Sequence, residues 1–292
     1  MFEKLEACPS CGNSSFHNEL ITEDFSVSNE SFAIVKCGKC SLLFTNPRPQ
    51  LESLSKYYDF PEYISHSNQT RSLTDIIYKI VRNYSLKKKF KLINSFSTSN
   101  SLLDYGCGTG HFLNTVHKNK WTVIGVEPNN NAHQNIERNI KKYIYPSIQY
   151  VPKNQKFGII TLWHVLEHIH DLSNTIETLK SLLEKNGRLV IAVPNPNSYD
   201  AKYFKSHWAA YDVPRHLYHF TQDSMKYMLK KHNLKLENIE PMKFDSFYVS
   251  LLSNKYKYKK SRYLNSFITG YKSNSYAYNS GEYSSLIYII SH

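Results

Sequence analysis

The chain has 292 residues, of which 41% are hydrophobic and 21% charged, so it is long enough for one large folded domain with a small additional module. No apolar run approaches the ~20 residues of a membrane-spanning helix, and the first residues lack the apolar core of a secretory signal. We therefore expect a cytoplasmic protein without a membrane span. The net charge of +12 fits nucleic acid, a membrane surface or an acidic substrate as partner, but also a merely lysine-rich composition.

Four of the five cysteines form two C-x-x-C pairs, Cys8 with Cys11 and Cys37 with Cys40. Each pair offers two thiolates from one turn, and four thiolates complete a tetrahedral Zn²⁺ shell with no position left for a substrate. We expect a structural zinc ribbon over residues 1–48, with a strand at 32–36 that enters the second pair. Two redox-active dithiols are the alternative. So small a segment would take most of its folding free energy from the metal.

Residues 49–98 should connect this ribbon to the main domain. The stretch 51–66 is rich in tyrosine, and apolar residues between 76 and 93 recur at helical spacing. We expect one or two helices here, followed by a polar linker at 97–101.

A glycine-rich stretch at 102–110 is the strongest signal in the chain. A short apolar strand ends at Asp104, and Gly106, Gly108 and Gly110 then alternate with other residues before a helix begins at 111. This is neither the G-x-G-x-x-G dinucleotide fingerprint nor a P-loop. A second strand, 121–126, ends at Glu127, where an acid can accept the hydroxyl groups of a ribose.

The remaining elements alternate between strand and helix, which predicts a parallel, doubly wound α/β sheet. They are a helix capped by Asn129, a third strand within 143–151, a fourth at 157–163, a helix ending near 184 with Asn186 and Gly187 as its C-cap, a fifth strand at 188–193, a helix from Thr221 through 229, and two last strands at 244–252 and 284–290.

The D-x-G-x-G-x-G spacing with the acid that follows resembles motif I of class I S-adenosylmethionine (SAM)-dependent methyltransferases. The resemblance implies a Rossmann-like, mostly parallel seven-stranded sheet over residues 99–292, with its last strand antiparallel, and a segment within 49–98 that covers the cofactor. It also implies a set of SAM-binding residues at the carboxyl ends of the strands: Asp104, Tyr105, Gly106, Gly108, Gly110, Glu127, Pro128, Trp163 and His164.

Residues 164–168 read H-V-L-E-H, which out of context is the H-x-x-E-H motif of inverted zinc proteases. Their position directly after a buried strand favours the methyltransferase interpretation, because SAM methyltransferases carry V-L-E-H there. The segment also resembles the ubiquinone-pathway O-methyltransferases, in which an acid stands at the position of His164 and the group can hold a divalent cation. Histidine is a departure from that pattern and leaves metal dependence open. The plain alternative is that Glu167 and His168 hydrogen-bond within the fold.

A second polar cluster, 207–220, contains P-R-H-L-Y-H-F, which resembles a motif of a bacterial group of zinc-ribbon-bearing SAM methyltransferases. A histidine there can remove a proton from the acceptor as the methyl group arrives. Our candidate catalytic residues are His216, His164 and His168, and Arg215 could hold a carboxylate or phosphate. The alternative is that His219 and Phe220 merely pack.

The sequence thus predicts a SAM-dependent methyltransferase with structural zinc that acts on a small molecule or glycan precursor. Two alternatives are an RNA methyltransferase, suggested by the charge and the zinc ribbon, and a SAM-binding scaffold without turnover. The basic, aromatic stretch 254–262 can serve single-stranded nucleic acid but also fits a solvated loop between the last strands. The acceptor atom and the oligomeric state stay open.

Overall fold

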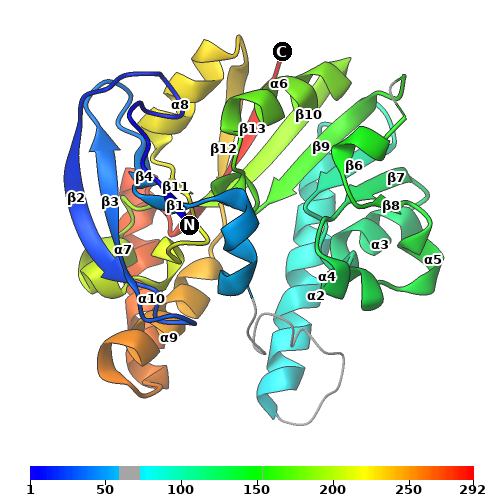
Figure 1. The fold of residues 1–292 in the computed structure, drawn as a ribbon. Helices are drawn as coiled ribbons and strands as arrows, with labels where there is room; N and C mark the ends of the chain where they lie inside the picture. The colour runs from blue at the N-terminus through cyan, green and yellow to red at the C-terminus, as the bar shows by residue number, and fades with distance from the viewer. Residues whose placement is uncertain (59–72, 153) are drawn as a thin grey trace. The chain divides into compact units, whose positions relative to one another are not determined.

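The computed structural model describes residues 1–58, 73–152 and 154–292, with side chains described from residue 79 onward in the helix that starts at Leu73. The chain divides into two compact units (Figure 1). One contains Met1–Phe60, His164–Glu177 and Ile191–Ile290, and the other contains Pro61–Trp163, Thr178–Val190 and Ser291–His292. The segment boundaries at residues 48 and 98 that we expect from the sequence stay a prediction.

The N-terminal residues form two small antiparallel sheets. β1 (Phe2–Glu3) pairs with β5 (Arg48–Pro49). The larger sheet has the order β11-β4-β3-β2, in which β2 (Phe16–Glu23), β3 (Ser31–Cys37) and β4 (Leu43–Thr45) come from the N-terminus and β11 is Tyr218–His219. β3 confirms the strand expected at 32–36. Because Tyr218 pairs with Phe44, the second polar cluster adds a strand to the cysteine-bearing module.

The main sheet has seven strands in the order β12-β13-β10-β9-β6-β7-β8. β6 pairs in parallel with β7 and β9, and β7 with β8. This confirms the predicted Rossmann-like, mostly parallel architecture. The strand bounds are β6 Ser101–Tyr105, β7 Thr122–Val126, β8 Ile144–Tyr145, β9 Phe157–Trp163, β10 Leu183–Pro194, β12 Lys235–Pro241 and β13 Ser285–Ser291.

Helices with local sequence signals follow these strands. α3 (His111–Lys118) begins after Gly110, and the Asn129 side chain accepts hydrogen bonds from the first N–H groups of α4 (Asn130–Gln134). Thr221 and Ser224 form the capping box of α8 (Gln222–Lys231). The other α-helices are α2 (Leu73–Asn94), α5 (Arg138–Lys141), α6 (Leu172–Leu182), α7 (Tyr199–Phe204), α9 (Asp245–Tyr258) and α10 (Tyr263–Ser280), and the 3₁₀ turns are η1 (Leu51–Tyr57), η2 (Ile148–Tyr150), η3 (Leu166–His168), η4 (Lys205–His207) and η5 (Ala209–Tyr211).

The third strand, expected within 143–151, is found there as β8, which is two residues long. Two sequence-based expectations were wrong. The stretch 244–252 is not a strand but the start of α9, because its small residues recur at helical spacing and are buried. The predicted C-cap at Asn186 and Gly187 lies within β10, where a Cβ on Gly187 would stand 2.9 Å from the carbonyl oxygen of Phe157. That glycine serves close backbone approach and not a helix end.

Apolar side chains of the strands form the core. Leu102 and Leu103 of β6 and Ile159 and Ile160 of β9 are fully buried, as expected for strands covered on both faces. Within the part of the chain that the structure describes, no helix is long and apolar enough to span a bilayer.

Candidate functional site

The turn after β6 is built around three glycines in the left-handed region. Gly106, Gly108 and Gly110 have φ values of 74°, 55° and 77°. A side chain at these positions would be strained, and a Cβ on Gly110 would also meet the side chain of Ile140 at 2.5 Å. Gly110 is the N-cap of α3, so the glycine turn leads directly into the amino end of that helix.

Glu127 joins this turn to the end of β7. Its Oε2 accepts a hydrogen bond of 2.8 Å from the backbone N–H of Gly108, and its Oε1 accepts one of 2.9 Å from the N–H of Asn129. The carboxylate is therefore held in one orientation by two backbone donors. The structure thus brings together the glycine turn and the acid that the sequence places 17 positions after Gly110.

Asp104 is 2% exposed, and its Oδ1 accepts a hydrogen bond of 2.7 Å from the hydroxyl group of Thr161. Burial raises the pKa of this carboxyl group to about 7. Its position supports the turn from within the sheet.

Three other predicted cofactor residues lie at strand ends in the same unit. Tyr105 and Trp163 are half-buried and Pro128 is exposed. The Trp163 and Phe112 rings pack edge to face with their centres 5.4 Å apart, and Nζ of Lys89 lies 4.2 Å from the centre of the Trp163 ring. A cation over an aromatic face is attractive, so both neighbours help to hold the indole in place.

His164 belongs to the other unit and has a strained backbone, with φ of 57°. Its Nε2 lies 3.0 Å from Oδ2 of Asp245, and its Nδ1 lies 3.5 Å from Oε1 of Glu167. Burial opposes protonation, but the two carboxylates outweigh it and raise the pKa of His164 to about 9. At neutral pH the His164 imidazole is therefore protonated and positively charged, so it is better suited to position a neighbouring group than to act as a base.

His168 and His216 form a pair with ring centres 4.6 Å apart. Nδ1 of His168 is 3.0 Å from the carbonyl oxygen of Arg215, and Nδ1 of His216 is 2.9 Å from that of Ala210. A carbonyl only accepts hydrogen bonds, so each Nδ1 carries the proton, and in the neutral ring Nε2 keeps a lone pair. Burial and the charge of His216 lower the pKa of His168 to about 4.

Glu167 completes this group with a carboxylate that is 1% exposed. Among the described residues, neither of its oxygens has a hydrogen-bond partner, although Oε1 faces Nδ1 of His164. Ligand atoms of Glu167, His168 and His216 all lie within 4.8 Å of one another, so these three could hold a divalent cation. The protease motif would instead use His164 with His168, and His164 is engaged by Asp245.

Arg215 does not have the role considered for it from the sequence. It is 1% exposed, and its guanidinium donates hydrogen bonds to Asp24, to Asp212 and to the carbonyl oxygen of Tyr57. These contacts join segments almost 200 residues apart, so Arg215 stabilises the unit and is not available to bind an anionic acceptor.

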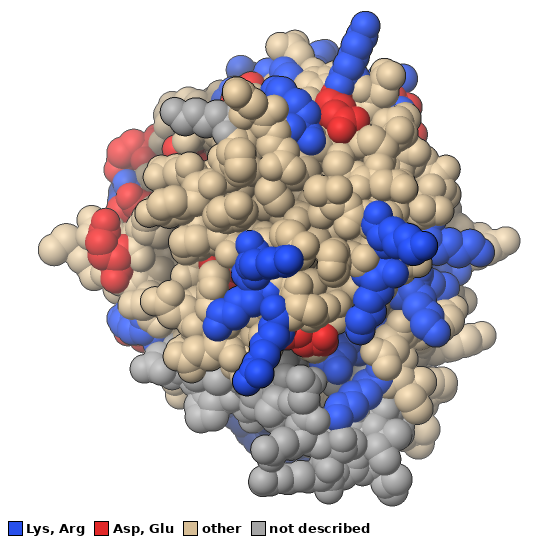
Figure 2. All heavy atoms as spheres, turned by 90° about the vertical axis from the view of Figure 1, so that its right-hand side faces the viewer, with Lys and Arg blue, Asp and Glu red and all other residues tan. Residues whose placement is uncertain are grey.

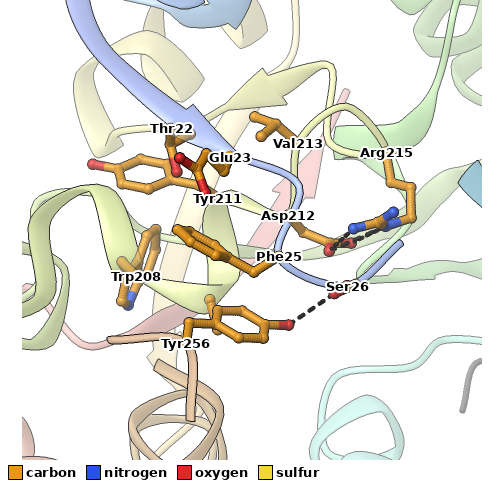
Figure 3. A pocket seen from close by; sticks show the side chains of 11 residues that line it. Thr22, Glu23, Phe25, Ser26, Trp208, Tyr211, Asp212, Val213, Arg215 and Tyr256 are labelled. Carbon is orange, nitrogen blue, oxygen red and sulfur yellow. Dashed lines mark hydrogen bonds and ion pairs between the residues drawn. The ribbon is translucent and has the colours of Figure 1, made fainter. Parts of the chain in front are cut away.

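A small pocket lies beside this ion pair (Figure 3). Phe25, Trp208, Tyr211 and Tyr256 supply its aromatic walls, and the Asp212–Arg215 pair lies at one end. Phe25 and Tyr256 are stacked with ring centres 5.1 Å apart. The cavity has room for about one water molecule and not for the ring of a ligand.

The four cysteines of the two C-x-x-C pairs come together in the N-terminal part of the same unit. Their sulfur atoms all lie within 4.8 Å of one another, and Sγ of Cys8 is 3.5 Å from that of Cys40. Burial alone would raise the pKa of the Cys37 thiol, but the N–H groups of Cys40 and Lys39 lower it to about 7. A thiolate at neutral pH is the form that binds metal.

Several residues of the site had no signal in the sequence. The Tyr58 hydroxyl lies 3.0 Å from Nδ1 of His168, and Asp24 and Asp245 supply buried or half-buried charge. Each comes from a segment distant along the chain, and only chain folding brings it near the histidines. The rest of the proposed cofactor lid, residues 59–66, lies outside the described residues.

Comparison with known proteins shows which family the chain matches. Residues 78–239 match the family model described as "Methyltransferase domain". Ubiquinone biosynthesis O-methyltransferase of Bradyrhizobium diazoefficiens is 23% identical over 125 residues, which are 40% of this chain and 49% of that protein, so the match spans about half of the relative's length.

Two solved structures share the fold. Magnesium protoporphyrin IX methyltransferase of Synechocystis PCC 6803, with bound SAH, has a TM-score of 0.50 at 12% identity, over 78% of this chain and 91% of that one. The O-methyltransferase from the trans-AT PKS multienzyme of Brevibacillus brevis, in complex with S-adenosyl-L-homocysteine, has a TM-score of 0.51 at 14% identity, over 74% and 75%.

Proposed function

We propose that this chain, which belongs to the methyltransferase-domain family of SAM-dependent enzymes, transfers a methyl group to a small molecule or glycan precursor. The observation that carries the proposal is the hydrogen bond from Gly108 to Glu127. This bond fixes the Glu127 carboxylate beside a turn that has no side chains at alternate positions. Together the carboxylate and the turn form a cradle for a nucleoside without phosphate. Bound SAM would supply an electrophilic methyl group.

The residues around this cradle have separate tasks in the proposal. Glu127 accepts hydrogen bonds from the ribose hydroxyl groups, while Gly106, Gly108 and Gly110 let the backbone approach the nucleoside. Asp104 holds the turn in place, and Tyr105, Pro128 and Trp163 flank it at the strand ends. This chain's contribution to the reaction is chiefly to align donor and acceptor and to exclude water.

His216 is our candidate for the group that takes a proton from the acceptor. Its Nδ1 is committed to the carbonyl oxygen of Ala210, which leaves Nε2 for the acceptor's hydroxyl or amine. His168 is held in the same tautomer beside it, and protonated His164 positions Glu167.

The four-cysteine cluster is proposed to hold structural zinc. Four sulfur ligands fit tetrahedral Zn²⁺ and leave no position for a substrate. The adjoining sheet depends on that site, because β3 ends at Cys37 and pairs with β4, and β4 pairs with β11 next to His216. The cysteines thus stabilise the segment that carries the candidate base.

RNA as the acceptor remains the second candidate, and the charge favours it. On the face shown in Figure 2, Lys and Arg side chains outnumber Asp and Glu but stand in separate groups and not in one continuous stripe. A groove for a nucleic-acid backbone would need a continuous basic track. The small-molecule acceptor is the better supported proposal, because the curated relative is named for an O-methylation in ubiquinone biosynthesis.

The deciding experiment uses methyl-labelled SAM with the purified full-length protein. Small molecules, nucleotide sugars and total RNA from a bacterial extract are offered separately, and the labelled fraction is identified. Label in the small-molecule fractions supports the proposal, whereas label in RNA supports the alternative. Calorimetric binding of SAM with no label in any fraction would indicate a scaffold.

The role of His216 needs its own variant. We expect His216→Ala to keep SAM affinity and to lose about 100-fold or more in turnover, as removal of a general base does. His17→Ala, at an exposed histidine of the same unit, is the matched control. Unchanged turnover in His216→Ala would exclude its assignment as the base.

A further inference from the structure

The connection between β12 and β13 is a helical hairpin in which the polarity of α10 is inverted. α9 and α10 pack against each other, and their fully buried side chains are small or polar, while Leu252 and Tyr256 of α9 pack half-buried against the neighbouring core. The fully buried residues are Ser246, Val249, Ser250, Ser253 and Asn254 from α9, and Ser266, Thr269, Gly270, Ser273 and Ala277 from α10. Helices of water-soluble proteins usually bury their large apolar residues instead.

The two helices approach closely and are joined by polar side chains. A Cβ on Gly270 would stand 2.9 Å from Cα of Phe247, so only glycine permits this separation. Nδ2 of Asn254 donates a hydrogen bond of 2.9 Å to Oγ of Ser266, and Oγ of Ser246 donates one of 3.1 Å to the carbonyl oxygen of Gly270. Small residues and interhelical hydrogen bonds of this kind are typical of helices packed in an apolar medium.

The outward face of α10 carries the large apolar residues. Leu264, Phe267, Ile268 and Tyr271 are 74%, 60%, 42% and 65% exposed. Their spacing of i, i+3, i+4 and i+7 places them on one face of the helix, opposite Ser266, Thr269 and Ser273. Such a continuous apolar face indicates a surface that another apolar phase covers.

Positive charge lies next to this face. Residues 242–281 contain seven Lys or Arg and a single acid, Asp245, so this segment supplies half of the chain's net charge of +12. Lys259, Lys260 and Arg262 are exposed in the turn between the two helices, directly before the apolar face begins. Clusters of basic residues next to an apolar helix face attract anionic lipid headgroups.

We propose that the α9–α10 hairpin docks the protein on membranes that contain anionic phospholipids. The α10 face formed by Leu264, Phe267, Ile268 and Tyr271 enters the interfacial layer, while Lys259, Lys260 and Arg262 contact lipid phosphates. The helices lie on the bilayer and do not cross it. A protein partner would also cover an apolar face, but the inverted packing together with almost purely positive charge favours a lipid surface.

The test is sedimentation of the full-length protein with sucrose-loaded vesicles. We expect the protein to sediment with vesicles of equal parts phosphatidylcholine and phosphatidylglycerol, to bind pure phosphatidylcholine at least about tenfold more weakly, and to dissociate as salt is raised. Absence of binding to the anionic vesicles would overturn the proposal.

Variants separate the two contributions. Leu264→Ser with Phe267→Ser should weaken vesicle binding at least about tenfold, because two side chains no longer enter the interface. Lys259→Glu with Lys260→Glu should abolish the preference for the anionic lipid. Ile21→Ser, at an apolar residue of β2 that is 64% exposed, is the control for loss of an exposed apolar side chain.

Circular dichroism and thermal melting establish that each variant is folded. If both double variants bind like the natural sequence, the hairpin is not the docking surface and the proposal fails. It also fails if the protein ignores vesicles and forms a dimer that Leu264→Ser with Phe267→Ser dissociates, since the face would then be covered by a second copy. These outcomes do not depend on methyl transfer.

Discussion

The backbone N–H of Gly108 donates a hydrogen bond of 2.8 Å to Oε2 of Glu127, which joins the turn after β6 to the end of β7. The two residues lie 19 positions apart and follow the carboxyl ends of neighbouring parallel strands. The bond orients the carboxylate before any ligand arrives, so less conformational entropy is lost on binding.

Replacement of this acid should weaken SAM binding. We expect Glu127→Ala to raise the dissociation constants for SAM and S-adenosylhomocysteine by about 30-fold or more, since two hydrogen bonds to a charged acceptor are worth roughly 2–3 kcal/mol or more. Isothermal calorimetry measures this. Glu137→Gln, which removes the charge of the next acid along the chain, should bind like the natural sequence, and equal affinity in all three proteins would contradict the assignment.

The glycines of the turn offer a comparison between strain alone and strain with a steric clash. A Cβ on Gly108 meets nothing within 4 Å, so Gly108→Ala adds only the cost of positive φ, about 1 kcal/mol of unfolding free energy. Gly110→Ala adds the clash with Ile140 at 2.5 Å and should cost about 2–4 kcal/mol. Chemical denaturation measures both losses of stability. A larger loss for Gly108→Ala than for Gly110→Ala would contradict this interpretation.

Metal removal tests the cysteine cluster. We expect about one zinc per chain by elemental analysis, and near zero in Cys37→Ser, with loss of structure in residues 1–48. Cys107→Ser removes the cysteine that lies outside the cluster, beside the glycine turn, and should keep its zinc. Protein that is folded and active with no bound metal would refute the zinc site.

The contact between His164 and Asp245 should make stability depend on pH. The folded-state pKa of His164, about 9, lies above the ordinary value of 6.5, so the contact stabilises the fold fully below about pH 6.5 and loses its effect as pH rises through 9. We expect Asp245→Asn to lower the free energy of unfolding by about 1 kcal/mol near pH 6 and by much less near pH 10. A difference that is the same at both pH values would show that the contact carries no charge.

Local sequence patterns were sufficient wherever one segment determines its own structure. The glycine turn, the Asn129 and Thr221 caps and the strand at 157–163 are found as predicted, because backbone conformation and hydrogen bonding to near neighbours fix them. The two C-x-x-C pairs likewise predict one cluster, since four thiols at that spacing can converge on a single ion. The family resemblance extended this to a seven-stranded, mostly parallel sheet.

Only the tertiary structure decided what surrounds the histidines. Asp24 is bound to Arg215 from 191 residues away, and Asp245 lies beside His164 because 244–252 folds as a helix and not as a strand. Aromatic and apolar residues predict a strand there, but the small residues of that stretch are buried by distant segments, as in the hydrogen bond from Ser246 to the carbonyl oxygen of Gly270. Burial and charge depend on which distant segments meet, so the protonated state of His164 and the neutral state of His168 follow from the fold alone.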